Sequence, residues 1–356
     1  MRILVRAPNW LGDAILCLPA VRALRRHDPA ARLVVLARPW VAGLYRRETW
    51  VDEVVVYPSG NGLDAWRRKF RLATALRGNF DWAVILPNSW ESALVPWLAR
   101  VPRRTGYDRG GRGLLLTEAV PVPSHGSIPA HESFYYLELL RRAGILAALP
   151  DPFPILLGGI EEARSRGREL FAAMGVEGQV VGLSPGAQNS RAKQWPPERF
   201  AEAGARLATE LGAWVAIFGS SAERELGWRV AAALRRAGVH VLDLAGETGL
   251  EDFIALAAAC EVFVSNDTGA MHLASALDVP TVGIFGPTEW YATGPAGPRS
   301  VIVREPVECS PCMLRDCPTD HRCMRKVTPD RVVRAALGLL ERRHEERGHA
   351  YQDSQS

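Results

Sequence analysis

Short runs of apolar residues alternate along the chain with longer segments in which apolar residues recur every three or four positions. The short runs predict buried β-strands, and the longer segments predict helices with one apolar face. Because strands and helices alternate, we expect parallel sheets covered by helices on both faces. In the first part of the chain the predicted strands are 2–7, 33–37, 54–57, 82–86 and 117–122, and the predicted helices are 13–27, 63–76 and 132–143.

The same alternation restarts after 149–159, which is rich in Pro and Gly and predicts a linker. Beyond it the predicted strands are 180–183, 214–218, 239–244, 262–265 and 281–285, and the predicted helices are 197–211, 222–237, 250–259, 270–277 and 329–343. A chain of 356 residues is long enough for two domains of roughly 150 residues each. We therefore expect two doubly wound, Rossmann-like α/β domains at 1–155 and 156–328, with a ligand cleft between them at the carboxyl ends of the strands.

The composition and the missing motifs exclude several classes of protein. Hydrophobic residues make up 47% of the chain and charged residues 23%, which excludes a disordered or fibrous protein. No apolar run approaches the roughly 18 residues of a membrane helix, and Asp13 interrupts the apolar start that a signal peptide would need. The sequence contains no P-loop, no G-x-G-x-x-G and no D-x-D, the paired carboxylates that hold a metal–diphosphate. A dinucleotide-dependent oxidoreductase is therefore disfavoured, and no nucleic-acid partner is expected.

Polar residues that directly follow a strand are the candidate site residues, since ligands bind at the carboxyl ends of parallel strands. In the first domain, Trp10, Gly12 and Asp13 lie between the first strand and the first helix. A carboxylate near a helix N-terminus is kept ionised and could accept a proton from a hydroxyl. A simple helix cap is the alternative for Asp13.

In the second domain, three loops carry candidate residues. The loop at 184–196 contains Lys193 and could seat a diphosphate before a helix, or be an ordinary solvated loop. Asp267, Thr268 and Gly269 form a turn from a strand into a helix, with His272 one helical turn further. Asn189 and Ser190 lie in the first of these loops, and the third loop, which follows the strand at 281–285, carries Thr288.

Six collinear segments together resemble the ADP-heptose:lipopolysaccharide heptosyltransferases, glycosyltransferase family 9, and most of all the type II enzymes. They are RAPNWLGDAILCLPAV at 6–21, LPNSWESAL at 86–94, RTGYDRGGRGLLLT at 104–117, SPGAQNSRAKQWP at 184–196, NDTGAMHLASAL at 266–277 and IFGPT at 284–288. The resemblance implies a GT-B fold and an inverting, metal-independent transfer of heptose from ADP-heptose to the first heptose of the lipopolysaccharide inner core. A type I or type III acceptor and a non-catalytic nucleotide-sugar binder are the alternatives.

The resemblance also implies roles for single residues. Asp13 matches the general base, Lys193 the lysine that neutralises the diphosphate, and Asp267, Thr268, Gly269 and His272 the donor-binding turn. Glu223 falls where relatives carry an acid that contacts the ribose. Asn88 and Ser89 match an acceptor-side segment of the type II enzymes. No cofactor is implied beyond the donor substrate, and the helix at 329–346 is expected to pack back toward the first domain, with a disordered tail at 347–356.

Charge is divided unevenly between the two halves. Residues 1–150 hold 21 Lys and Arg against 12 Asp and Glu, a net of +9, and the remaining 22 against 27 give −5. Under the resemblance, the basic half would meet an anionic lipid A–Kdo–heptose acceptor, so we expect a cytoplasmic protein that is peripheral on the inner membrane. The basic runs are Arg67, Arg68, Lys69 and Arg71, and Arg100, Arg103, Arg104, Arg109 and Arg112.

Four cysteines crowd together near the C-terminus with the spacing C-x2-C-x4-C-x5-C. Cys309, Cys312, Cys317 and Cys323 could hold a structural metal, form disulfides or remain free thiols. The oligomeric state stays open at this stage.

Overall fold

A computed structural model describes residues 1–60, 62–188 and 190–353, with the backbone alone described at 344 and 346–353. The chain divides into two compact units, Met1–Gly158 and Gly159–Ser356. The division falls at the end of the predicted linker, three residues after the boundary predicted at 155. Among the described residues, no helix is both long and apolar enough to cross a membrane.

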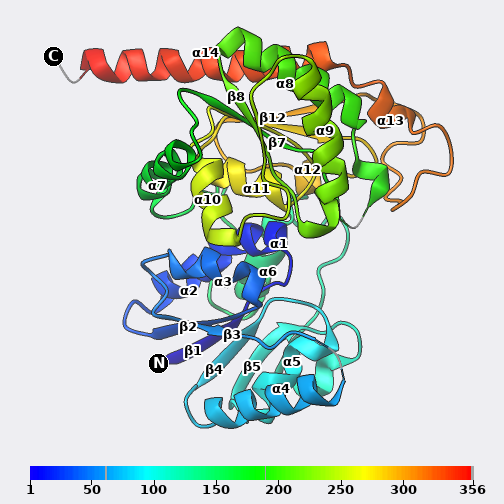
Figure 1. The fold of residues 1–356 in the computed structure, drawn as a ribbon. Helices are drawn as coiled ribbons and strands as arrows, with labels where there is room; N and C mark the ends of the chain where they lie inside the picture. Colours follow the sequence, from blue (N-terminus) through cyan, green and yellow to red (C-terminus); the bar gives the residue numbers. More distant parts are fainter. Residues whose placement is uncertain (61, 189, 354–356) are drawn as a thin grey trace. The chain divides into compact units, whose positions relative to one another are not determined.

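The first unit is a parallel sheet with flanking helices (Figure 1). Its strands are β1 (Arg2–Arg6), β2 (Arg32–Ala37), β3 (Glu53–Val56), β4 (Trp82–Ile85), β5 (Arg103–Tyr107) and β6 (Glu118–Val120). Its helices are α1 (Leu11–Leu16), α2 (Leu18–His27), α3 (Pro39–Arg46), α4 (Leu63–Leu76), α5 (Trp90–Leu98), η1 (Arg112–Leu115) and α6 (Ser133–Arg142). The strand order is β3-β2-β1-β4-β5-β6, so the chain starts at the centre of the sheet and winds outward both ways.

The second unit repeats this plan. Its strands are β7 (Val180–Ser184), β8 (Trp214–Ile217), β9 (Val241–Asp243), β10 (Val262–Asn266), β11 (Thr281–Phe285) and β12 (Ser300–Arg304), in the order β12-β11-β10-β7-β8-β9. Its helices are α7 (Ile160–Ala173), η2 (Arg191–Lys193), α8 (Pro197–Leu211), η3 (Ser221–Glu223), α9 (Arg224–Arg236), α10 (Leu250–Ala258), α11 (Gly269–Ala276), α12 (Trp290–Thr293), α13 (Arg322–Arg325) and α14 (Pro329–Asp353). All strand pairs in both sheets are parallel, which confirms the predicted α/β class.

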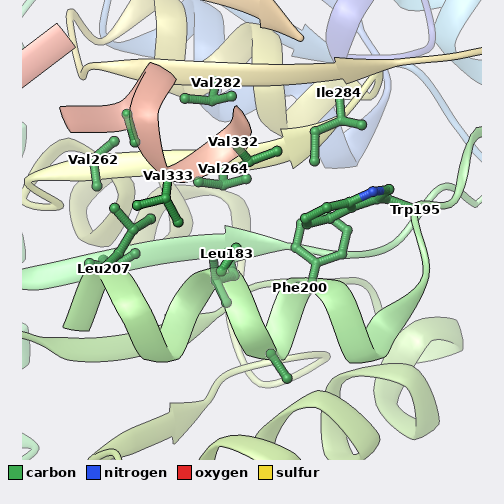
Figure 2. Packing of buried hydrophobic residues seen from close by; sticks show 14 of the residues in the cluster. Leu183, Trp195, Phe200, Leu207, Val262, Val264, Val282, Ile284, Val332 and Val333 are labelled. Carbon is green, nitrogen blue, oxygen red and sulfur yellow. The ribbon is translucent and has the colours of Figure 1, made fainter. Parts of the chain in front are cut away.

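One face of the second sheet is closed by α8 and α14 (Figure 2). Trp195 and Phe200 pack edge to face, with ring centroids 5.0 Å apart, beside Ile284 of β11. Val332 and Val333 of α14 belong to the same buried cluster. Burying such side chains stabilises the fold by about 1.5–3 kcal/mol each.

The last helix therefore differs from the expectation drawn from the family resemblance. We expected 329–346 to pack toward the first domain, but its apolar side chains lie in the core of the second unit, against α8, β10, β11 and β12. We also expected residues 347–356 to be disordered, but α14 continues as a helix to Asp353. Residues 354–356 of that tail lie outside the described residues.

Some other boundaries differ for local reasons. The helix predicted at 13–27 is two helices that meet at Cys17, because Pro19 lies in the first turn of α2 and cannot donate a backbone hydrogen bond. Strand β5 begins with Arg103 and Arg104 and has no apolar run to predict it. The Arg103 guanidinium lies 4.1 Å from the ring centroid of Trp82 on the neighbouring strand β4, which gives this charged residue an aromatic partner in the sheet.

Candidate functional site

Three neighbouring strands of the second sheet end in the loops that carry most of the candidate residues. Strand β10 lies between β7 and β11, so the loops after these strands adjoin at the carboxyl edge of the sheet. The loop after β7 leads to η2 and Lys193, the turn after β10 holds Asp267, and the loop after β11 reaches Thr288. Sequence reasoning placed these residues in one site, and the topology brings them together.

Lys193, Asp267 and Thr288 form one hydrogen-bonded group. The Lys193 Nζ lies 2.8 Å from Oδ2 of Asp267, and the Thr288 hydroxyl donates to the same oxygen at 2.7 Å. Asp267 is buried, at 4% exposure, whereas the Lys193 side chain keeps 27% of its surface exposed. The buried carboxylate is thus held by two donors, and it presents the ammonium group of Lys193 at the edge of the sheet.

The start of α11 adds backbone donors at the same edge. Thr268 is the N-cap residue, in an extended conformation with no side-chain cap, and Gly269 begins the helix. The first N–H groups of a helix have no partner within it, and together with the helix dipole they favour an anion. His272 is buried one turn further, and its backbone N–H donates to the Thr268 carbonyl.

Glu223 reaches the loop that follows β7, although it lies in the β8–α9 connection. Its carboxylate accepts hydrogen bonds from the backbone N–H of Ser220 at 2.8 Å and from the Ser220 hydroxyl at 2.7 Å. A Cβ atom added at Gly186 would lie 2.0 Å from Glu223 Oε1. Gly186 therefore allows this carboxylate to lie directly on the loop that leads to Lys193.

Ser190 has a supporting role in the structure. Its hydroxyl donates to the carbonyl oxygens of Leu314 and Arg315, at 3.4 and 3.2 Å. The backbone N–H of Ala192 donates to the Arg315 carbonyl at 2.9 Å, and His321 Nε2 lies 2.6 Å from the Ala192 carbonyl oxygen. The segment that carries the clustered cysteines thus braces the loop of Lys193. Asn189 lies outside the described residues.

The six cysteines are free thiols in the structure. The disulfide alternative for Cys309, Cys312, Cys317 and Cys323 is therefore not formed. Within the described ranges, no three His, Cys, Asp or Glu side chains are grouped so that they could hold a metal ion.

Asp13 of the first unit lies in the first turn of α1, after the loop that leaves β1. Trp10 is the N-cap residue of this helix, and its side chain is exposed. Gly12 lies between them in the same turn. After burial, the negative charge of Asp13 contributes to the raised pKa of Glu132 and to that of Tyr136.

Glu132 is a candidate that sequence reasoning missed. Burial first, and then the negative charge of Asp13, raise its pKa to about 7, although Arg109 opposes the shift. A buried carboxyl group whose pKa is raised toward neutrality is typical of proton-transfer sites. Nothing in the local sequence marks Glu132, because its neighbour Asp13 lies more than a hundred residues away.

Asn88 also contacts α6. Its side-chain amide donates to the Tyr135 hydroxyl at 2.9 Å, while its own Oδ1 is buried without a hydrogen-bond partner among the described residues. Ser89 is exposed and is the N-cap residue of α5. Tyr135 lies in the first turn of α6 and Glu132 is the N-cap residue of that helix, so Asn88 contacts the same end of α6 as Glu132.

The two basic runs are not uniformly solvated. Lys69 is 7% exposed and pairs with Glu91, and Arg112 is fully buried, where it donates to the carbonyls of Pro87 and Tyr107. Both therefore differ from the solvated faces that such runs usually form.

The chain is similar over nearly its whole length to known glycosyltransferases. The family model described as Glycosyltransferase family 9 (heptosyltransferase) matches residues 69–322. Lipopolysaccharide heptosyltransferase 2 of Salmonella typhimurium is 33% identical over 346 residues, covering 96% of this chain and 99% of that protein. Lipopolysaccharide heptosyltransferase 1 of Pseudomonas aeruginosa is 36% identical, covering 96% and 98%. The solved structure of Escherichia coli ADP-heptose lps heptosyltransferase II matches with a TM-score of 0.82 at 30% identity, covering 97% of this chain and 100% of that one.

The raised pKa of Glu132 makes a prediction about stability. Between its ordinary value of 4.5 and the folded value of about 7, the folded protein holds a proton that the unfolded chain releases. The free energy of unfolding therefore loses this contribution as the pH rises through that window. Glu132→Gln removes the titration, so the stability of the wild type relative to this variant should fall between pH 5 and pH 7.5 in urea unfolding.

Glu138→Gln on the same helix is the matched control. Hydrogen bonds and charge from Arg141 and Arg142 lower the pKa of Glu138, although its side chain is buried. Its contribution is lost only as the pH falls below the ordinary range, so the stability difference for Glu138→Gln should stay constant from pH 5 to 7.5. The same constant difference for Glu132→Gln would contradict the raised pKa.

Proposed function

Because the chain belongs to glycosyltransferase family 9, the heptosyltransferase family, we propose that it transfers L-glycero-D-manno-heptose from ADP-heptose to the first heptose of the lipopolysaccharide inner core. Its two doubly wound α/β units are those of a GT-B glycosyltransferase, as the full-length match to a solved heptosyltransferase II indicates. The observation that carries the proposal is the group of Lys193, Asp267 and Thr288 at the carboxyl edge of the second sheet.

The second unit would bind the donor. The Lys193 ammonium group and the first N–H groups of α11 would face the diphosphate, which gains negative charge as ADP leaves. Asp267 and Thr288 would keep Lys193 in place. Glu223, whose carboxylate lies against Gly186, would accept hydrogen bonds from the ribose hydroxyls. His272 would support the turn from its buried position.

The first unit would bind the acceptor and supply the base. Asp13 would take the proton of the attacking heptose hydroxyl as its oxygen forms a bond to the anomeric carbon of the donor. The bond from that carbon to the diphosphate oxygen breaks at the same time, so ADP leaves with the electron pair and the configuration inverts. Trp10, Gly12, Asn88 and Ser89 would line the acceptor side.

The proposed reaction needs no metal cofactor. Lys193 and the helix N-terminus place positive charge where ADP departs, which is the task a divalent cation would otherwise perform. The sequence accordingly has no D-x-D motif that would hold such a cation.

We place the reaction at the cytoplasmic face of the inner membrane, with the enzyme bound peripherally. The supporting observation is the net charge of +9 in residues 1–150, since the acceptor is an anionic glycolipid.

Two alternatives differ from this proposal in their products. The likeness to a heptosyltransferase 1 from Pseudomonas aeruginosa favours, as the second candidate, transfer to an acceptor that lacks the first heptose. A nucleotide-sugar binder without activity would bind ADP-heptose and transfer nothing.

The test of the function is mass spectrometry of the products formed from ADP-heptose with defined lipid A–Kdo acceptors. An acceptor that carries the first heptose should gain one heptose, and the acceptor without it should remain unchanged. Transfer to the acceptor without the first heptose would identify a type I enzyme. No transfer to either acceptor would favour the nucleotide-sugar binder without activity.

Replacing Asp13 tests the assignment of the base. Asp13→Asn should lower kcat about a hundredfold to ten-thousandfold, which is the usual contribution of a general base. ADP-heptose affinity, measured by calorimetry, should stay at the wild-type value because Asp13 belongs to the acceptor unit. Turnover within a few-fold of wild type would contradict the role.

Replacing Lys193 tests the donor site. Lys193→Gln keeps a donor for Asp267 but removes the charge, so the Kd for ADP should rise about tenfold to a hundredfold, equivalent to about 1.5–3 kcal/mol. Arg191→Gln is the control. Arg191 lies two residues before Lys193, but its side chain is 82% exposed and pairs with Asp316. Equal losses in both variants would show only a general charge effect.

A further inference from the structure

Three cationic side chains are buried together at the carboxyl edge of the first sheet. Arg6 is the last residue of β1, Arg38 follows β2, and Lys69 comes from α4. Their exposures are 1%, 8% and 7%. Tyr57, directly after β3, completes the group, since its ring lies under both guanidinium groups, with ring centroid to Cζ distances of 4.3 Å for Arg6 and 4.6 Å for Arg38.

One carboxylate faces these three cations in the described part of the chain. Glu91 Oε1 lies 2.5 Å from Lys69 Nζ and 3.2 Å from Arg38 Nη2. Burial opposes ionisation of Glu91, but the hydrogen bond from Lys69 and the nearby positive charges outweigh it and lower its pKa. The group therefore carries three positive charges and one negative charge.

Arg6 carries much of this excess. Its guanidinium donates to the backbone carbonyls of Ala7 and Leu36 and to Oδ1 of Asn9, all of them neutral acceptors. Burial lowers its pKa to about 10, so it is still charged at neutral pH. Buried charges are normally paired, because an unpaired one is strongly disfavoured.

The same guanidinium groups also keep unused donors. Nε of Arg6 and Nε of Arg38 are both buried and have no hydrogen-bond partner among the residues that the structure describes. Buried polar atoms without a partner are few in folded proteins and need an explanation. An anion that binds at this group would explain both the excess of positive charge and the donors without a partner.

Exposed aromatic rings border this group. The Arg38 guanidinium lies 5.7 Å from the ring centroid of Trp40, and Lys69 Nζ lies 5.7 Å from that of Trp66. Both indoles are half exposed. An exposed ring face next to a group of cations suits a ligand that has an apolar C–H face and an anionic group, as an acidic or phosphorylated sugar does.

The group is also joined to the loop that precedes the helix of Asp13. Arg6 Nη2 donates to the Asn9 side chain at 2.5 Å, and Trp40 Nε1 donates to the Asn9 carbonyl at 2.7 Å. Asn9 lies in the short connection from β1 to α1, four residues before Asp13. A ligand held by these cations would therefore be next to the segment that presents the carboxylate.

We propose that Arg6, Arg38 and Lys69 form a subsite that binds an oxyanion on a sugar of the acceptor, with Glu91 occupying the cations until that sugar arrives. The ligand group is a carboxylate or a phosphate, which guanidinium groups bind with paired hydrogen bonds. The inference rests on the proposed function, because it assigns the subsite to the acceptor.

Two substitutions with opposite expected effects on the KM for the acceptor test the subsite. Lys69→Gln removes a cation and should raise the KM for the acceptor about tenfold or more, with the KM for ADP-heptose unchanged. Glu91→Gln removes the competing carboxylate and should lower the KM for the acceptor. Arg77→Gln, at the exposed end of the same helix, is the control and should change neither value.

The source of the anion is distinguished by the acceptor used. If the penalty of Lys69→Gln disappears with phosphatase-treated acceptor, the group is a phosphate, and if it disappears with carboxyl-reduced acceptor, it is a carboxylate. A penalty that persists when both groups have been removed would overturn the subsite. Equal changes in the two KM values, or the same direction of change in Lys69→Gln and Glu91→Gln, would also overturn it.

A binding measurement without turnover separates this inference from the proposed function. Inorganic phosphate and the free Kdo monosaccharide are titrated calorimetrically into the wild type, Lys69→Gln and Glu91→Gln. Weaker binding to the first variant and tighter binding to the second would support the subsite even if heptose transfer failed. Binding to neither probe by the wild type, in a protein that does transfer heptose, would overturn the subsite alone.

Discussion

The loop after β7, which carries Lys193, depends on the side chain of Asn266, the last residue of β10. This amide is fully buried, and its Nδ2 donates to the carbonyls of Pro185 and Gly186 at 2.8 and 3.2 Å. Its Oδ1 accepts the backbone N–H of Trp195 at 3.0 Å. A single amide thus holds both ends of the loop after β7, and the position of Lys193 within that loop follows from it. A buried amide with its donor and acceptor satisfied can hold such a loop in one conformation.

The candidate loops of the second unit could be predicted from the sequence because they depend on strand order and turn chemistry. Apolar runs followed by small and polar residues predicted the edge of the second sheet, and parallel pairing brought Lys193, Asp267 and Thr288 together. Ser190 shows the limit of this reasoning. A hydroxyl in a loop that resembles a phosphate-binding loop can equally donate to backbone carbonyls, as it does here. Which of the two occurs depends on a segment more than a hundred residues later in the chain.

Residues of the first unit were harder to predict because their environment comes from distant elements. Arg6 ends an apolar strand, and only the positions of Arg38, Tyr57 and Glu91 on neighbouring elements show that its charge is in excess. The pKa of Glu132 is raised by burial and then by the charge of Asp13, which follows a different strand. Helix α14 was misplaced for the same reason, since an amphipathic pattern shows that a helix packs but not which sheet it covers.

The position of α14 has a consequence for how the protein is made. Domains tend to fold one after the other, N-terminal first, as the chain is synthesised. The first unit is complete at Gly158, so its sheet can close while the rest of the chain is still being added. The second unit is different, because Val332, Val333, Ala336, Leu339 and Leu340 are part of its core. Its folding must wait for nearly the whole chain, and any truncation before α14 leaves an apolar surface open to aggregation.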